Sequence, residues 1–109
     1  MCMDKQTAIH AFLEQAKVLI SQGHFDFVPR RKNMMSLAEY GLLVTDAREE
    51  IQSLAVSDYY SGPEHDRDRP GHIWVFKKTI GGTVFYIKLK IDDLKDIKRL
   101  KCISFHTDE

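Results

Sequence analysis

Cysteine and long apolar runs are scarce in this sequence, and each scarcity excludes a class of protein. Its two cysteines, Cys2 and Cys102, belong to no metal-binding spacing, so a disulfide framework or a zinc module is not indicated. No run of about 18 apolar residues occurs, so we expect no membrane-spanning helix. The first ten residues lack the basic and apolar regions of a signal peptide, and we expect a reducing, cytoplasmic compartment.

The size and charge of the chain favour one small globular domain. Its 109 residues suit a single modest core, so we expect one domain over residues 1–109. Sixteen basic residues balance 16 acidic ones, which gives no overall attraction to nucleic acid. The charge is uneven, however, because residues 73–91 contain four lysines and no carboxylate. This stretch predicts a local positive surface on a neutral protein.

Residues 73–91 predict a β-hairpin that turns at Gly81-Gly82. Two adjacent glycines favour a tight type I′ turn, because both can adopt positive φ without a Cβ clash. The turn fixes the register, so that Lys77 is expected opposite Tyr86, and side chains then alternate between two faces. The predicted apolar face holds Trp74, Phe76, Phe85, Ile87 and Leu89, and the predicted polar face holds Lys77, Tyr86, Lys88 and Lys90.

Helices are expected before the hairpin and one strand after it. The predicted helices cover residues 4–22, 34–40 and 45–55, with a linker over 24–32 and a charged loop over 57–72. A polar loop or helical turn over 92–98 is expected to lead to a last strand over 99–106. Asp4 and Thr45 are the predicted N-caps of the first and third helices, and Gly23 ends the first. The predicted class is α+β, with a small antiparallel sheet and the N-terminal helices packed on one face.

The last predicted strand adds side chains to both faces of the hairpin. Simple alternation places Leu100, Cys102, Ser104 and His106 on the polar face, and Lys101, Ile103 and Phe105 on the other. Ile103 and Phe105 would then extend the apolar wall. Ser104 and His106 would lie beside Tyr86 and Lys88.

The polar face collects residue types that can cleave RNA without a metal. The 2′-hydroxyl of the substrate is the nucleophile in such a reaction, so the protein supplies a base, an acid and fixed positive charge. Tyr86 and His106 are the candidates for proton transfer, and Lys77 and Lys88 are the candidates for stabilising the phosphate. The alternative is that lysines on an exposed sheet face only provide solubility and discourage edge pairing.

The charged loop before the hairpin has two interpretations. Residues 64–69 alternate acid and base, which suits a self-neutralised surface loop whose exposed ion pairs contribute little. Alternatively, Asp66 and Asp68 orient Arg67 and Arg69 toward phosphate. The candidate substrate-binding residues are Arg67, Arg69, Lys90 and His72.

Three further groups of residues have both a functional and a structural interpretation. Tyr59 and Tyr60 can stack on bases, or pack at a strand edge. The run 30–32 can contact a phosphate backbone, or be a solvated linker. His65 and His72 are too few to indicate a metal site, because no third histidine or cysteine motif supports them, and we expect no cofactor.

Several segments between Asp58 and His106 together resemble one family. They are DYYSGPEHDRDRPGHIWVF, the following Gly-Gly, VFYIKLKI and KCISFH, and the helical segments AKVLISQGHF and AEYGLLVTDAREEIQSLAVSDYY extend the similarity over nearly the whole chain. The sequence resembles the MqsR-like toxins of bacterial type II toxin–antitoxin pairs. The resemblance implies a RelE-like fold and an mRNA interferase, a metal-independent endoribonuclease that a partner antitoxin silences.

The resemblance matches two positions of the polar face and departs at three positions. Tyr86 matches the sheet tyrosine of the family, and Lys88 matches the lysine two positions on. Ser61 and His106 stand where the better-known branch has lysines, and Val75 stands where it has a glutamine.

These departures allow two interpretations of the site. Either the catalytic set is rebuilt around His106, Lys77 and the loop with Arg67 and Arg69, or this branch has changed or lost its activity. We expect the former, because RelE-like sheets tolerate different catalytic sets. The expected protein is an endoribonuclease with RNA as its substrate and an adjacently encoded antitoxin as its partner. The alternatives are a non-catalytic module that binds RNA or protein on the same sheet, and a metal-dependent enzyme that rests only on scattered histidines.

Overall fold

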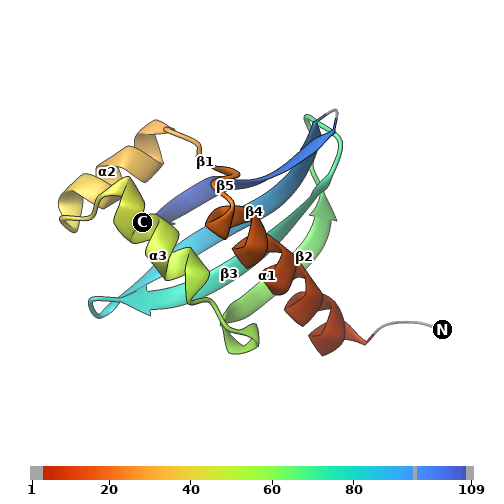
Figure 1. Cartoon of the computed structure of the whole chain (residues 1–109). Coiled ribbons are helices and arrows are strands. Elements are labelled where there is room, and N and C mark those ends of the chain that lie inside the picture. The colour runs from red at the N-terminus through yellow and green to blue at the C-terminus, as the bar shows by residue number, and fades with distance from the viewer. Residues whose placement is uncertain (1–3, 95, 108–109) are drawn as a thin grey trace.

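The computed structural model describes residues 4–94 and 96–107, and it places three α-helices around a five-stranded sheet (Figure 1). The helices are α1 (Lys5–Ser21), α2 (Arg31–Glu39) and α3 (Val44–Gln52), with a short 3-10 turn, η1 (Val56–Asp58). The strands are β1 (Phe25–Phe27), β2 (Tyr59–His65), β3 (His72–Ile80), β4 (Thr83–Leu94) and β5 (Ile97–Thr107), in the sheet order β1-β5-β4-β3-β2. The predicted α+β class is confirmed, although β1 runs parallel to β5 and makes the sheet mixed. Cys2 lies outside the described residues.

Strands β3 and β4 pair in the register that the Gly81-Gly82 turn predicts. The two glycines have φ of 58° and 84°, and Lys77 lies opposite Tyr86. The predicted apolar face is buried, since Phe76, Phe85, Ile87 and Leu89 are fully inaccessible. Trp74 is half-buried and stacks on Phe12 of α1, with 4.7 Å between the ring centroids.

Helix α1 covers one face of the sheet because its apolar residues recur at helical spacing. The six residues that form its buried stripe are Ile9, Phe12, Leu13, Ala16, Leu19 and Ile20. Asp4 caps the helix as predicted, since its Oδ1 accepts the N–H of Thr7 at 2.8 Å, and Gly23 follows the last turn with φ of 82°. Helices α1 and α3 lie in front of the same face in Figure 1.

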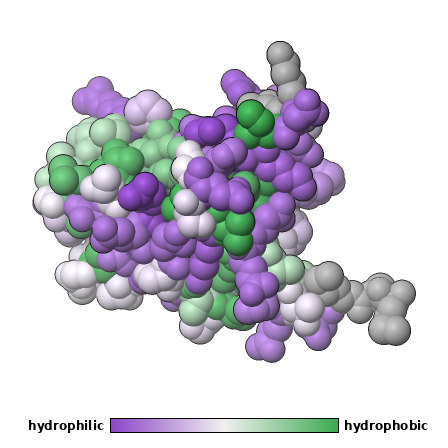
Figure 2. Space-filling view, viewed as in Figure 1, coloured by the Kyte–Doolittle hydropathy of each residue, from purple (hydrophilic) through white to green (hydrophobic). Residues whose placement is uncertain are grey.

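The helix-covered side of the molecule is mostly hydrophilic, as Figure 2 shows. Apolar side chains gather on it over the end formed by α2 and the turn that leads to α3 (Figure 2). The exposed apolar residues of that region are Met34, Met35, Tyr40, Leu43 and Val44. Within the described ranges, no helix is both long and apolar enough to cross a membrane.

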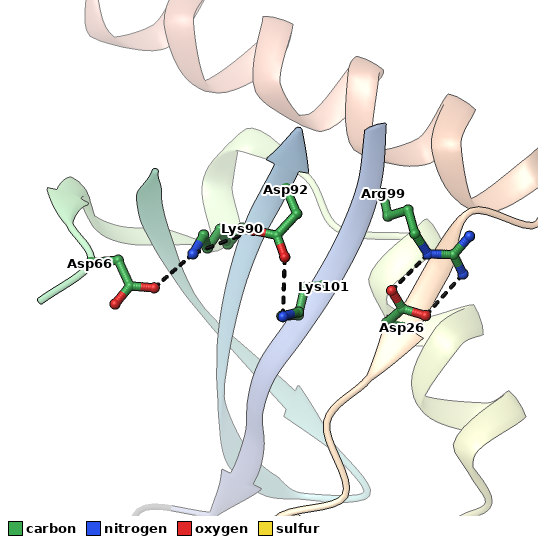
Figure 3. Close-up of polar contacts among 6 residues, drawn as sticks. All are labelled: Asp26, Asp66, Lys90, Asp92, Arg99 and Lys101. Carbon is green, nitrogen blue, oxygen red and sulfur yellow. Dashed lines mark hydrogen bonds and ion pairs between the residues drawn. The ribbon is translucent and has the colours of Figure 1, made fainter. Parts of the chain in front are cut away.

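The segment 24–32, predicted to be a linker, instead contains β1 and the start of α2. Strand β1 pairs in parallel with Leu100–Cys102 of β5. Asp26 of β1 also accepts two hydrogen bonds from Arg99, at 2.7 and 2.9 Å, and this contact lowers the pKa of the Asp26 carboxyl (Figure 3). A strand of three residues shows too little alternation to be recognised in a sequence. The strand that stabilises it lies 75 residues later in the chain.

Two segments predicted to be loops, 57–72 and 92–98, contain strand residues, and in the first of them a loop remains over 66–71. Strand β2 lies beside β3 at the edge of the sheet, and two register shifts interrupt its period between Tyr59 and Glu64. In the segment 92–98, residues 92–94 extend β4 and residues 97–98 begin β5, because the two long strands pair as far as Leu94 and Ile97. The third helix begins at Val44, and its first turn is closed by Asp46, which accepts the N–H of Leu43 at 2.7 Å, rather than by Thr45.

A bulge in β5 reverses the predicted faces for the first half of that strand. Lys88 of β4 lies opposite Ser104, but the next residue, Leu89, lies opposite Cys102, so Ile103 is an extra residue. The prediction for the residues up to the bulge was therefore wrong. Leu100 and Cys102 are fully buried in the core, whereas Lys101 and Ile103 line the polar face. Ser104, Phe105 and His106 follow the bulge and keep their predicted faces.

Helix α2 closes the edge of β5 beyond the end of β1. Asn33 is fully buried, its Nδ2 donates to the carbonyl oxygen of Ile103 at 2.9 Å, and its Oδ1 accepts the N–H of Phe105 at 3.0 Å. One turn further along the helix, Ser36 Oγ accepts the N–H of Thr107 at 3.3 Å. Two side chains thus satisfy backbone groups that a neighbouring strand would otherwise bind, and one of them holds the bulge.

Replacing Asn33 by Ala should lower the free energy of unfolding by roughly 2–4 kcal/mol, because two buried backbone groups of β5 lose their partners. Urea denaturation followed by circular dichroism measures this loss. The control is Met35→Ala on the exposed face of the same helix, for which we expect a change within about 0.5 kcal/mol. Equal losses for the two variants would show that Asn33 does not secure the edge of β5.

Candidate active site

Three rows of side chains run across the face of the sheet that α1 leaves uncovered. The rows are Lys77, Tyr86 and His106; Val75, Lys88 and Ser104; and Ile73, Lys90 and Lys101, taken in each case from β3, β4 and β5. Residues directly opposite on antiparallel strands bring their Cβ atoms to about 5 Å. The structure therefore brings together the four predicted catalytic residues on one surface, which we call the basic sheet face.

The first row is organised around the ammonium group of Lys77. Its Nζ lies 4.6 Å from the ring centroid of Tyr86 and 3.8 Å from that of Tyr60. Tyr60 belongs to β2, at the first of its register shifts, and is 54% exposed, so its ring can stack on a base. Tyr59 does not share this role, because it packs edge-on against Trp74 on the core side.

His106 is held in one tautomer by a backbone contact. Its Nδ1 lies 2.8 Å from the carbonyl oxygen of Thr107, and because that oxygen can only accept, Nδ1 carries the hydrogen. The lone pair of the neutral ring is then on Nε2. Burial lowers the pKa of His106, and the positive charges of Lys32, Arg30 and Lys88 lower it further. The ring is therefore neutral at neutral pH and able to accept a proton.

Lys88 is a lysine of this face whose charge is available to a ligand. It forms no ion pair among residues 4–94 and 96–107. Ser104 lies opposite Lys88, and its hydroxyl accepts a long hydrogen bond, 3.5 Å, from Nη1 of Arg30. Arg30 and Lys88 thus approach the same part of β5, where two cations can bind one anion.

Lys90, predicted to bind substrate, is instead enclosed by carboxylates (Figure 3). Its side chain is 2% exposed, and its Nζ lies 2.7 Å from Asp66 and 3.3 Å from Asp92. Asp92 also binds Lys101 at 3.1 Å. Burial by itself lowers the pKa of Lys90, but the hydrogen bonds to the two carboxylates outweigh burial, so the pKa is raised. The geometry favours a structural role for this lysine.

An open groove of about 840 Å³ separates the basic sheet face from the charged loop after β2. Arg67 and Arg69 line it together with Lys88. The loop is not self-neutralised, since its Asp66 binds Lys90 of the sheet. Within the described part of the chain, Asp66 and Asp68 form no ion pair with the arginines between and beside them.

The last predicted substrate-binding residue, His72, lies away from this groove. It borders a hollow beside Phe12 and Trp74, on the side of the sheet that α1 covers. Its ring is 4.6 Å from that of His65, which lines the groove. The described residues contain no group of three or more histidine, cysteine or acidic side chains that could hold a metal.

Comparison with known protein families gives one match that spans most of the chain. The family model described as "Motility quorum-sensing regulator, toxin of MqsA" matches residues 8–107, which include every strand and the whole basic sheet face. The chain belongs to the MqsR toxin family. The resemblance predicted from the sequence is thereby confirmed, and the protein is a toxin of a toxin–antitoxin pair, which implies an antitoxin partner. A comparison with curated proteins found no match.

The three positions that the sequence resemblance marks as departures from the better-known branch are neighbours in the structure. Ser61 of β2 lies opposite Val75, and Val75 lies opposite Lys88. His106 lies opposite Tyr86. Ser61, Val75 and His106 therefore lie around Tyr86 and Lys88, the two positions that the resemblance matches.

The pKa of His106 should lie below its usual value and should rise when a neighbouring cation is removed. Arg30→Gln removes one of the positive charges that disfavour the imidazolium, so its His106 pKa should move up toward the usual value. Titration of the histidine ring protons by NMR measures the change. Lys98→Ala, at the opposite end of β5, is the control that should leave His106 unchanged. An unchanged pKa in Arg30→Gln would contradict the proposed proximity of these charges.

Proposed function

We propose that this MqsR toxin is a metal-independent endoribonuclease that cleaves RNA through the 2′-hydroxyl of its substrate. The observation that carries the proposal is the row of Lys77, Tyr86 and His106, with Lys88 beside it on the same open face. The row supplies a base, a hydroxyl donor and fixed positive charge from residues that lie opposite one another on neighbouring strands. The cytoplasm, which contains the RNA, is the compartment where the enzyme acts.

Each group of the row has a role in the transesterification. His106 Nε2 accepts the proton of the substrate's 2′-hydroxyl while the 2′-oxygen forms a bond to phosphorus. The bond from phosphorus to the 5′-oxygen breaks, and the hydroxyl of Tyr86 donates a proton to that leaving oxygen. Lys88 and Lys77 stabilise the negative charge that grows on the non-bridging oxygens. The products are a 2′,3′-cyclic phosphate and a 5′-hydroxyl.

The groove beside the row binds the rest of the substrate. Arg67 and Arg69 on the loop and Arg30 before α2 are suited to phosphates that flank the reacting one, because guanidinium groups bind phosphate oxygens in pairs. Tyr60 provides an exposed ring on which a base can stack. Single-stranded RNA, whose bases are free to stack, is therefore the substrate class that this surface fits.

The second candidate function is a module that binds RNA without cleaving it. Ser61 and Val75 favour it, because they replace a lysine and a glutamine of the better-known branch beside Lys88. The arginines that line the groove remain in either case. Cleavage and binding are therefore measured separately.

The purified protein should cut RNA in the presence of EDTA, should leave 2′,3′-cyclic phosphate and 5′-hydroxyl ends, and should not cut DNA, which lacks the nucleophile. The variants Tyr86→Phe, Lys88→Ala and His106→Ala should each lower the turnover rate on the order of 100-fold, the usual loss for a positioned acid, base or electrostatic donor. Mapping the ends of a mixed RNA pool and single-turnover rates measure these outcomes.

The chain offers a matched control for each variant. Tyr40→Phe, Lys98→Ala and His10→Ala change the same residue types at exposed positions outside the basic sheet face. They should retain full activity. Undiminished cleavage by all three site variants would refute the assignment, and RNA binding without any cleavage by the wild type would favour the binding module.

We also expect an antitoxin, encoded beside this protein, to bind it and silence it. Expression of the toxin alone should arrest growth, because it would deplete RNA, and coexpression of the small neighbouring gene should restore growth. Affinity purification from the native host measures the complex directly. The control is Tyr86→Phe combined with His106→Ala, which should relieve the arrest while still capturing the antitoxin. Harmless expression together with the absence of a small bound protein would rule this partner out.

A further inference from the structure

We propose that Lys90 and Asp66 form a latch that holds the loop 64–71 on the sheet, and that the latch positions Arg67 and Arg69 for the RNA backbone. The inference rests on the proposed function and deepens it. It gives Lys90 a positioning role in place of the phosphate contact expected from the sequence.

The latch is a shielded ion pair that joins the middle of the sheet to the loop (Figure 3). Nζ of Lys90 lies 2.7 Å from Oδ2 of Asp66, and the two side chains are only 2% and 14% exposed. An ion pair screened from water in this way is held more firmly than a surface pair. Asp92 binds Lys90 from the other side at 3.3 Å and so fixes the direction of its side chain.

The loop is fastened to the latch at several points along its length. The N–H of Asp66 donates to the carbonyl oxygen of Gly71 at 3.1 Å, and Oδ1 of Asp66 accepts the N–H of Asp68 at 2.9 Å. Gly71 also packs against the stem of Lys90, because a Cβ at this position would lie 2.7 Å from Cε of the lysine. The head and the stem of Lys90 therefore contact opposite ends of the same loop.

The arginines that the loop presents have no carboxylate to hold them. Arg67 and Arg69 are exposed, line the groove with Arg30 and Lys88, and form no ion pair among the described residues. An exposed arginine on a mobile loop loses conformational freedom when it binds, and a fastened loop reduces that loss. Asp66, the residue before Arg67, instead binds Lys90, while Glu64 and Asp68 line the groove beside the arginines.

The variant Asp66→Asn tests the latch because two explanations predict opposite results. Removing an acid beside an RNA groove should strengthen RNA binding if only the local charge matters. The latch predicts weaker binding, because the arginines lose their position. We expect a rise in KM with little change in kcat, and a smaller salt dependence of binding, by roughly 0.7 in the log–log slope for each phosphate that the arginines no longer bind. Binding is measured with a 2′-O-methyl oligonucleotide, which cannot be cleaved.

Three further variants make the experiment decisive. Asp68→Asn makes the same charge change on the same loop without touching Lys90, and should not weaken binding. Asp66→Asn should have no further effect on RNA affinity in a protein that already carries Arg67→Gln and Arg69→Gln, because the latch acts through these side chains. Gly71→Ala displaces the stem of Lys90 without removing a charge and also strains the backbone at a φ of 118°, so it should weaken binding in the same direction as Asp66→Asn.

Hydrogen exchange at the amide of residue 66 reports the latch independently of RNA. Relative to its intrinsic rate, this exchange should be faster in Asp66→Asn than in the wild type. If the wild type binds RNA, unchanged or tighter binding by Asp66→Asn would overturn the latch. The latch would also be overturned if Asp66→Asn lowered the RNA affinity equally with and without Arg67 and Arg69. A wild-type protein that fails to bind the oligonucleotide would overturn the proposed function and the latch together. The two failures are therefore distinguished by the wild-type signal.

Discussion

The bulge at Ile103 is the constraint on which both the core and the basic sheet face depend. Strict alternation through β5 could bury Leu100 and Cys102, or present His106 beside Tyr86, but not both, because a shift of one residue exchanges the faces of a strand. The extra residue allows both arrangements in the same strand. Asn33 secures the bulge by bonding the backbone on each side of Ser104, so the geometry of the row depends on a buried amide of α2.

The basic character of this face results from how its carboxylates are distributed rather than from the total charge, which is zero. Asp66 and Asp92 bind Lys90 and Lys101, and these four charges cancel at one end of the groove. Lys88 lies next to this neutral network on β4 and forms no ion pair with the described residues. A neutral protein can therefore present positive charge locally, where some of its acids are bound by lysines.

Local sequence features predicted the hairpin and α1 because the information for both is contained within about 20 residues. Gly81-Gly82 fixed the register, and this alone placed Lys77 opposite Tyr86. Strand β2 was missed because two register shifts interrupt its alternation, although its partner β3 follows it closely in the chain. Strand β1 and the bulge could not be predicted from local features, since each is stabilised by residues far away in the chain. The burial of Lys90 was missed for the same reason, because alternation gives the face of a side chain but does not show that Asp66 folds over it.

The Lys90–Asp66 ion pair and His106 respond to pH in different ranges, so a pH profile can separate RNA binding from proton transfer. The hydrogen bond from Lys90 lowers the pKa of Asp66, so the stability it contributes is present above the unfolded value of about 3.9 and is lost as pH falls through the lower folded value. The pKa of Lys90 is raised, so its contribution is lost only as pH rises beyond about 10.4. The latch therefore stays charged across the neutral range. Among these three groups, histidine is the one whose usual pKa lies near neutrality, and burial lowers the pKa of His106. A fall in the rate of RNA cleavage on the acid side of neutrality would then report protonation of the base, His106. The loop that holds the arginines remains in place over this range.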